Sequence, residues 1–305
     1  MPQSIIRSEL LKRHLDRLTR ALPGVEQGDV RALHRARVAS RRLRELIPVL
    51  QLEHSTSKKL SRRLRKMTLR LGTVRELDVL MLGIDEMHEA CGEQSSALAR
   101  VGVAVSTERD HARRRLFTQL PLDGIRRLTQ KLDRAVTELQ LAEASSSRSA
   151  VRLWKWAVDA RVERRAARFA TAVHEAGAVY IPERLHSVRI ALKKLRYALE
   201  LSNDVSAVRD EVDLRTLKRG QDLLGRMHDL QVLIDRVRQV QASLTPPNVA
   251  VWRELDALIA RLEDDCRRLH ARYMRARDAL TAIAVRLGAA HASSGAAAQR
   301  TRRAG

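Results

Sequence analysis

One basic string that begins with histidine occurs twice in this chain. Residues 34–44 read HRARVASRRLR and residues 186–196 read HSVRIALKKLR, an offset of 152 residues. The offset pairs His34 with His186, Arg37 with Arg189, Arg41 with Lys193, Arg42 with Lys194 and Arg44 with Arg196. A repeat of this length predicts a duplicated structural unit, so we expect two similar halves.

A second matching segment follows each copy of the string. Residues 71–80 read LGTVRELDVL and residues 224–233 read LGRMHDLQVL, an offset of 153. The same register pairs three further basic positions, Arg62 with Arg215, Arg65 with Lys218 and Lys66 with Arg219. We expect each Leu-Gly pair to separate a basic helix from an acidic-apolar helix. Arg75 matches His228 and Asp78 matches Gln231, so the symmetry of this segment is incomplete.

Apolar residues recur at helical spacing through nearly the whole chain, which predicts an all-α fold. Only 7 prolines and 13 glycines interrupt 305 residues, and aromatic residues make up 3%. We expect helices at residues 4–22, 30–47, 57–71, 76–90, 95–120, 125–144, 151–179, 182–202, 208–224, 229–244 and 249–287. A serine-rich linker at 145–149 divides them into half-repeats at about 4–144 and 151–286. Residues 287–305 contain no acid and are expected to form a disordered basic tail.

A helical wheel separates the charged and apolar residues of the repeated string. At about 100° per residue, His34, Arg37, Arg41 and Arg44 fall within an arc of about 80°. The apolar residues, among them Ala36 and Leu43, lie on the opposite side. The second copy repeats the pattern, with His186, Arg189, Lys193 and Arg196 on one stripe. Cations aligned without acids are locally unfavourable, so two such stripes indicate an anionic partner.

The charge of the whole chain points the same way. Lys and Arg number 58 against 36 Asp and Glu, which gives a formal net charge of +22 and a pI near 11.3. Such a surface attracts polyanions, and arginine, which dominates, suits phosphate oxygens. Two isolated cysteines, Cys91 and Cys266, argue against a disulfide framework or a zinc site. No apolar run is long enough to span a membrane and no signal peptide is visible, so we expect a cytoplasmic protein.

The two histidines allow several interpretations. Each could cap or support its helix, donate hydrogen bonds to phosphate oxygens, or act as a phosphate acceptor or general base. No acidic pair, Ser-His-Asp order or glycine-rich phosphate loop accompanies them, so no catalytic residue and no metal site is predicted. The acidic residues of the RELD segment ending at Asp78, and of the matching HDLQ segment ending at Gln231, are expected to form ion pairs with arginines of the repeated string.

Both repeated segments together resemble the CHAD family, the conserved histidine α-helical domain. The resemblance rests on the motif His-x-x-Arg-[Val/Ile]-x-x-[Arg/Lys]-[Arg/Lys]-Leu-Arg, present twice, and covers roughly residues 4 to 286. It implies an all-α domain of two pseudo-symmetric four-helix bundles whose basic residues line a central cleft. It also implies binding of inorganic polyphosphate and recruitment to polyphosphate granules. A triphosphate-cleaving domain, which some members carry in addition, has no matching motif here.

The expected function is therefore a non-catalytic polyphosphate-binding module without cofactors, formed by a single domain over residues 1–286. The expected binding residues are His34, Arg37, Arg41, Arg42, Arg44, Arg62, Arg65, Lys66, His186, Arg189, Lys193, Lys194, Arg196, Arg215, Lys218 and Arg219. A nucleic-acid binder is the alternative, which the scarcity of aromatic residues for base stacking disfavours. An enzyme that transfers phosphate through histidine or cleaves polyphosphate is the third alternative. The oligomeric state stays open.

Overall fold

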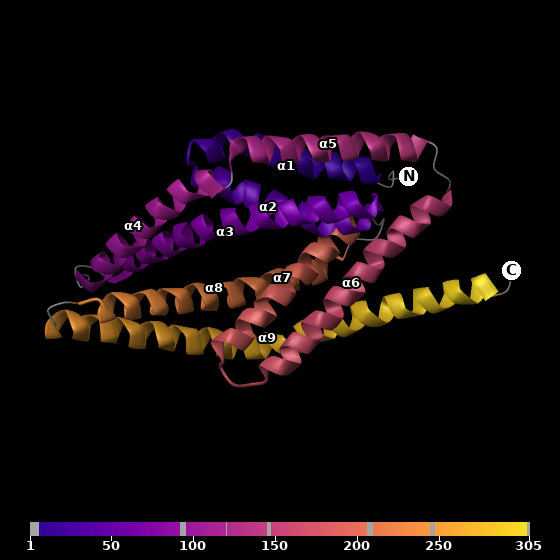
Figure 1. The fold of residues 1–305 in the computed structure, drawn as a ribbon. Coiled ribbons are helices and arrows are strands. Elements are labelled where there is room, and N and C mark those ends of the chain that lie inside the picture. Colours follow the sequence, from indigo (N-terminus) through magenta and orange to yellow (C-terminus); the bar gives the residue numbers. More distant parts are fainter. Residues whose placement is uncertain are drawn as a thin grey trace.

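The computed structural model describes residues 6–91, 96–119, 121–144, 148–205, 210–244 and 248–303; the side chains of 89–91, 117, 148–152 and 290–303 are outside this description. The described residues form α-helices and one 3₁₀ turn and contain no strand, so the predicted all-α class is confirmed (Figure 1). The elements are α1 (Arg7–Glu26), α2 (Val30–Leu46), η1 (Ile47–Val49), α3 (His54–Cys91), α4 (Ser96–Gln119), α5 (Leu122–Ala144), α6 (Arg148–Ala176), α7 (Pro182–Val205), α8 (Glu211–Ala242) and α9 (Val249–Arg303).

The two halves repeat one packing order. The repeated strings form α2 and α7, and the segments that follow them lie on α3 and α8. In the first half α1 packs on α2, α2 on α3, α3 on α4 and α1 on α5. In the second half α6 packs on α7, α7 on α8, and α9 on both α8 and α6. The single helix α9 thus takes the place of α4 and α5 together.

Three clusters of buried apolar side chains hold the helices together. One fills the first half, with Leu10, Leu43 and Leu132 on α1, α2 and α5. Another fills the second half, between α6, α7, α8 and the later part of α9. A third cluster joins the halves, because Val101 of α4 and Leu255 of α9 belong to the same core. Figure 1 shows the pair α3–α4 and the pair α8–α9 extending together away from the rest. The halves are therefore fused along one side of the molecule.

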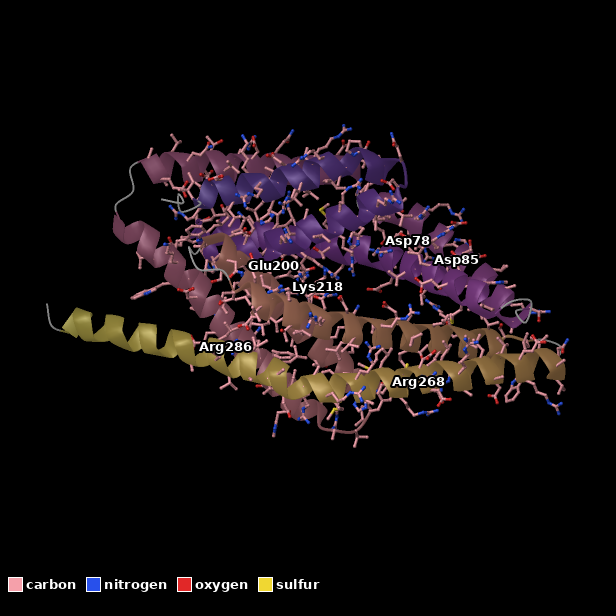
Figure 2. All side chains as sticks on the ribbon, turned by 180° about the vertical axis from the view of Figure 1, so that it is seen from behind. Asp78, Asp85, Glu200, Lys218, Arg268 and Arg286 are labelled. Carbon is pink, nitrogen blue, oxygen red and sulfur yellow. The ribbon has the colours of Figure 1, made fainter. Side chains whose placement is uncertain are left out.

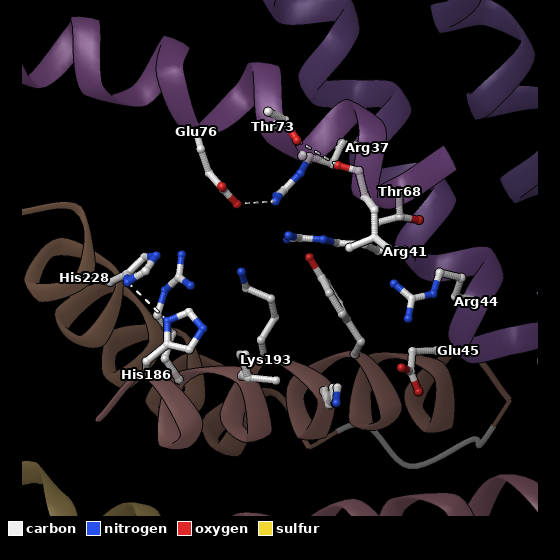
Figure 3. A pocket seen from close by; sticks show the side chains of 16 residues that line it. Arg37, Arg41, Arg44, Glu45, Thr68, Thr73, Glu76, His186, Lys193 and His228 are labelled. Atoms are coloured by element: carbon white, nitrogen blue, oxygen red, sulfur yellow. Dashed lines mark hydrogen bonds and ion pairs between the residues drawn. The ribbon is translucent and has the colours of Figure 1, made fainter. Parts of the chain in front are cut away.

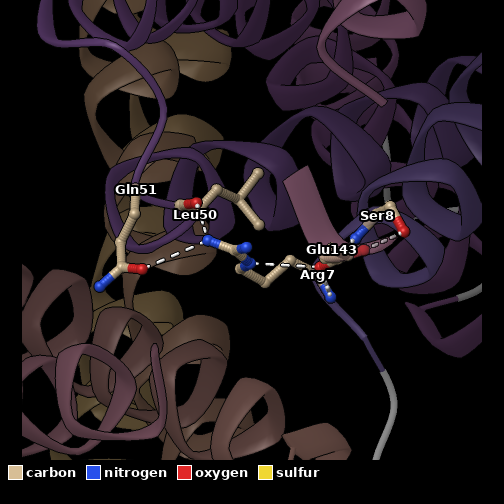
Figure 4. A network of polar contacts seen from close by, with 5 residues as sticks. All are labelled: Arg7, Ser8, Leu50, Gln51 and Glu143. Atoms are coloured by element: carbon tan, nitrogen blue, oxygen red, sulfur yellow. Dashed lines mark hydrogen bonds and ion pairs between the residues drawn. The ribbon is translucent and has the colours of Figure 1, made fainter. Parts of the chain in front are cut away.

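Polar contacts fix the start of the chain in the first half (Figure 4). The Arg7 guanidinium lies 3.2 Å from the Glu143 carboxylate of α5, and the Ser8 hydroxyl donates to that carboxylate at 2.5 Å. Arg7 also donates to the carbonyl of Leu50 at 3.4 Å and to the side-chain oxygen of Gln51 at 3.2 Å. One buried arginine therefore connects α1, α5 and the turn after η1.

Both predicted Leu-Gly breaks are wrong, because α3 and α8 continue through Gly72 and Gly225. One glycine costs a helix only about 1 kcal/mol relative to alanine, which the packing of a long helix outweighs. The expected end of the first helix at residue 22 is also wrong, since α1 continues through Pro23 to Glu26 and ends before Gly28, whose φ is +77°. Pro23 removes one backbone donor from the last turn of α1, and the burial of Leu22 and Val25 keeps that turn packed on the core. The second expected helix, 30–47, agrees with α2, which ends at Leu46, and Pro48 lies in the 3₁₀ turn η1.

The end of the chain also differs from the expectation. Helix α9 continues to Arg303, where the sequence predicted disorder from residue 287. Alanine, frequent in this segment, is the strongest helix former, and no proline follows residue 247 to stop the helix. The predicted linker at 145–149 lies partly outside the described residues, and α6 begins at Arg148.

Candidate anion-binding site

The described residues enclose a cavity of about 400 Å³ where the two halves meet. Its walls come from α2 and α3 of the first half and from α7 and α8 of the second (Figure 3). The lining residues are Arg37, Arg41, Arg44, Glu45, Thr68, Leu69, Gly72, Thr73, Glu76, His186, Arg189, Ile190, Lys193, Lys194, Tyr197 and His228. We call this cavity the central cleft.

Cations of the two repeated helices converge on the central cleft. They are Arg37, Arg41 and Arg44 from α2 and Arg189, Lys193 and Lys194 from α7. The apolar sides of the same helices face the cores, as the helical wheel predicted: Ala36 and Leu43 on α2 and Leu195 on α7 are fully buried. Because α2 packs against α7, the two basic stripes come together instead of facing solvent separately.

Lys193 lies among these cations, and its pKa is strongly affected. Burial, followed by the charges of Arg41 and Arg189, lowers the pKa of its ammonium to about 6. Burial is also the first cause that lowers the pKa values of Arg37 and Arg189. The central cleft therefore disfavours its own positive charges, and a bound anion would relieve this cost.

Carboxylates compensate part of the charge. Glu76 of α3 forms an ion pair with Arg37 at 3.3 Å, although its side chain is 64% exposed. Asp229 of α8, which matches Glu76 in the repeat, is partly buried, and burial raises its pKa against the opposing effect of Arg189. The predicted pairing of the RELD segment with the repeated string is therefore confirmed for Glu76, whereas Asp78 pairs at 3.1 Å with Arg113 of α4.

A second acid of the central cleft is committed to the scaffold. Glu45 of α2 is buried, and its carboxylate accepts from Arg161 at 2.7 Å and from Arg165 at 3.1 Å, both on α6. This network fixes the first half against the first helix of the second. Two guanidinium groups of α6 bind Glu45, and its charge also partly offsets the lowering of the pKa values of Arg44 and Lys194, for which burial is the first cause.

Histidine is placed differently in the two halves. His186 lines the central cleft, and its Nδ1 lies 3.2 Å from Nδ1 of His228, the residue that replaces Arg75 in the repeat. A hydrogen bond between these atoms requires that only one of them carries a proton. Burial and nearby cations lower the pKa of both rings, that of His228 to about 3. Both histidines are therefore neutral near pH 7, and the ring that accepts in this pair keeps its Nε2–H free to donate to an anion.

His34 does not line the central cleft and does not cap its helix. Asp29 is the N-cap of α2, and its carboxylate accepts from the backbone N–H groups of Arg31 and Ala32. His186 is likewise inside α7, which begins at Pro182. The capping interpretation of the histidines is therefore wrong. Burial, then Arg75 and Arg37, lower the pKa of His34, so it lies within electrostatic reach of the cleft cations.

The structure brings only some of the expected binding residues together. Seven of them line the central cleft, namely Arg37, Arg41, Arg44, His186, Arg189, Lys193 and Lys194. His34 and Arg42 line a different cavity between α1 and α2. Arg196 is held by Glu200 and by Gln221, to whose oxygen it donates at 2.9 Å. The six remaining positions, Arg62, Arg65, Lys66, Arg215, Lys218 and Arg219, are exposed on α3 and α8 and lie outside the lining (Figure 2 labels Lys218).

Nine lining residues were absent from the expected set. They are Glu45, Thr68, Leu69, Gly72, Thr73, Glu76, Ile190, Tyr197 and His228. The sequence did contain a signal for Glu76 and His228, because both belong to the second repeated segment. Glu45 and Tyr197 occupy matching positions, one residue beyond each string, but their chemistry differs and offers no common pattern. Thr68, Thr73 and Leu69 enter the lining only because α3 crosses α2 at this place.

Two structural findings bear on other functions. In the part of the chain that the structure describes, no group of three or more His, Cys, Asp or Glu side chains is arranged to hold a metal ion. Among the described helices, none is both long and apolar enough to cross a lipid bilayer. Cys266 is a free, buried thiol.

Comparison with known proteins gives a consistent result. The family model described as "CHAD domain" matches residues 9–238. The crystal structure of the CHAD domain from the plant Ricinus communis is similar with a TM-score of 0.60 and 21% identity, over 89% of this chain and 95% of that one. PptA from Streptomyces chartreusis is similar with a TM-score of 0.61 and 19% identity, over 88% of this chain and 97% of that one. A search of curated proteins finds no match.

Proposed function

Because this chain belongs to the CHAD domain family, we propose that it is a non-catalytic module that binds inorganic polyphosphate in the central cleft. One observation carries the proposal: six cations of α2 and α7 line one cavity in which Lys193 has a pKa lowered to about 6. Polyphosphate carries one negative charge per internal phosphate, and this charge would compensate the cations of the central cleft. In the cell, such a module would reside in the cytoplasm and could associate with polyphosphate granules.

The mechanism would be electrostatic capture. Arginine guanidinium groups can hold two phosphate oxygens at once, so Arg41 and Arg189 would fix successive phosphates from opposite walls. Lys193 would add a point charge, and His186 an N–H donor. Release of counterions from the chain would make affinity fall steeply with salt, as it does for nucleic acids.

A charge-neutralising pair of substitutions tests the proposal. We expect Arg41→Gln/Arg189→Gln to lower the affinity for long-chain polyphosphate about tenfold or more, because two phosphate contacts are lost. The slope of log affinity against log salt should decrease by about two. The matched control is Arg126→Gln/Arg127→Gln, two exposed arginines of α5 outside the central cleft, with the same change in net charge. Unchanged affinity in the cleft variant would overturn the proposal.

Two further arms separate the alternative functions. In competition titrations, polyphosphate should displace duplex DNA at low concentration, whereas DNA should not displace polyphosphate. The reverse result would favour a nucleic-acid binder. After incubation of the protein with Mg²⁺ and labelled polyphosphate, all of the label should remain in the polyphosphate. Released phosphate or a stable phosphohistidine would overturn the non-catalytic assignment.

A further inference from the structure

A second basic cavity lies on the other side of α2. It has a volume of about 800 Å³ and is formed by α1 and α2. Its lining residues are Arg17, Arg20, Ala21, His34, Arg35, Val38, Ala39 and Arg42. Four arginines and one histidine thus share a cavity whose described lining contains no carboxylate. We call it the α1–α2 cavity.

The charges of the α1–α2 cavity are only partly compensated. Arg35 reaches Asp29 at 3.5 Å and Arg42 reaches Glu200 at 3.2 Å. Arg20 donates to a backbone carbonyl of its own helix at 3.3 Å, and within the described residues neither it nor Arg17 has a carboxylate within 4.0 Å. Partial burial, followed by the charges of Arg42 and Arg13, lowers the pKa of Arg17, and the charge of Asp204 opposes this effect. Like the central cleft, this cavity favours an anion over its own isolated charges.

Helix α2 connects the two cavities. Arg37 and Arg41 of this helix line the central cleft, while His34 and Arg42 line the α1–α2 cavity. Residues three apart on a helix have Cβ atoms about 5–6 Å from each other, so His34 lies directly beside Arg37. Basic side chains therefore continue around α2 from one cavity to the other, without a carboxylate between His34 and Arg37 on that stripe.

The matching residues of the second half are arranged differently. Arg35 is replaced by Ser187 in the second copy, and His186 turns into the central cleft instead of away from it. A feature required only to maintain the duplicated fold would be expected on both halves. The α1–α2 cavity is therefore an addition to the symmetric site.

We propose that the α1–α2 cavity binds a further stretch of the same linear phosphate chain, which reaches it from the central cleft over His34. The inference rests on the proposed function of the central cleft. A short chain would fill the central cleft alone, whereas a long chain would engage both cavities at once. Once a polyphosphate molecule is bound in the central cleft, its contact with the α1–α2 cavity is intramolecular. The affinity for polyphosphate therefore rises with its length, although the central cleft itself does not change.

The test compares two ligands on one pair of variants. We expect Arg17→Gln/Arg20→Gln to lower the affinity for long-chain polyphosphate about tenfold and to leave the affinity for tripolyphosphate within about twofold. Both side chains are exposed, so the substitutions should leave the melting temperature unchanged. The control Arg126→Gln/Arg127→Gln removes the same charge from α5 and should leave both affinities unchanged.

Each outcome has a distinct meaning. If the wild-type protein binds neither ligand, the proposed function itself fails. If it binds both but Arg17→Gln/Arg20→Gln weakens them equally, or weakens neither, the α1–α2 cavity is not a second segment of the site. If the α5 control loses long-chain affinity to the same extent, net charge alone accounts for the effect and the inference is overturned.

Discussion

At the scale of single residues, Lys193 governs how the central cleft responds to pH. Its pKa is lowered to about 6 by burial and by Arg41, Arg189 and Arg37, against the opposing effect of Asp229. In the free protein it is therefore mostly neutral above pH 6. A bound polyanion favours the ammonium and raises this pKa, so binding takes up a proton over the range between the two values.

We therefore expect affinity for polyphosphate to rise as the pH falls from about 8.5 toward 6, by at most about tenfold per pH unit. Below pH 6 the contribution of Lys193 should level off, because the residue is then already charged in the free protein. Calorimetric titrations at several pH values measure the slope. Lys193→Met should bind more weakly and lose most of the dependence. A wild-type profile that is flat over this range, or a slope that survives in Lys193→Met, would contradict the assignment.

At the scale of helices, the glycine at position 72 inside α3 has a structural reason. A Cβ at position 72 would lie 3.2 Å from Nη2 of Arg37, tighter than ordinary van der Waals contact, and 3.4 Å from its Nε. Glycine therefore lets the guanidinium lie against the helix and reach Glu76 at 3.3 Å. The residue that the sequence indicated as a helix break instead makes room for a cation of the central cleft.

The substitution Gly72→Ala should separate stability from binding. Alanine favours an internal helical position by up to about 1 kcal/mol, so the free energy of unfolding should be unchanged or higher. Arg37 must shift, and polyphosphate affinity should fall about threefold to tenfold through the loss of a charge-assisted contact. Gly83→Ala on the same helix is the control, because a Cβ there meets nothing within 4 Å. Equal affinities in the two variants would show that Gly72 has no role in positioning Arg37.

At the scale of the whole molecule, the central cleft depends on how the two halves are joined. The third core places α4 against α8 and α9, and Val101 is fully buried in it. Val103, two residues further along α4, is 68% exposed. The same substitution can therefore be made at a position inside the third core, Val101, and at a position outside it, Val103.

We expect Val101→Asp to lower the free energy of unfolding by about 3–5 kcal/mol, because an unpaired carboxylate would be buried there. Val103→Asp should change it by less than about 0.5 kcal/mol. Urea denaturation followed by circular dichroism measures both. Polyphosphate binding should weaken in the first variant alone, since the walls of the cleft come from both halves. Full affinity in Val101→Asp, with stability reduced as expected, would show that the third core does not position the cleft.

Much of this protein could be predicted from local pattern. Apolar periodicity identified the all-α class and the buried sides of α2 and α7, including Ala36 and Leu43. The repeat identified corresponding helices in the two halves. The exposed positions on α3 and α8, such as Arg62 and Lys218, could not be separated from the cleft residues, because position on a helix does not reveal how far that helix lies from its partner.

By itself, the sequence determined that the chain is helical, which side of α2 and of α7 is apolar, and that a basic stripe occurs twice. These properties depend on residues within a few turns of one another. Only the tertiary structure decided that the stripes of α2 and α7 face each other, that His186 meets His228 while His34 turns toward α1, and that Glu45 is bound by two arginines of α6. The physical reason is that these contacts join different helices, as His186 of α7 and His228 of α8 do, and packing between helices, which no local period encodes, sets which sides meet.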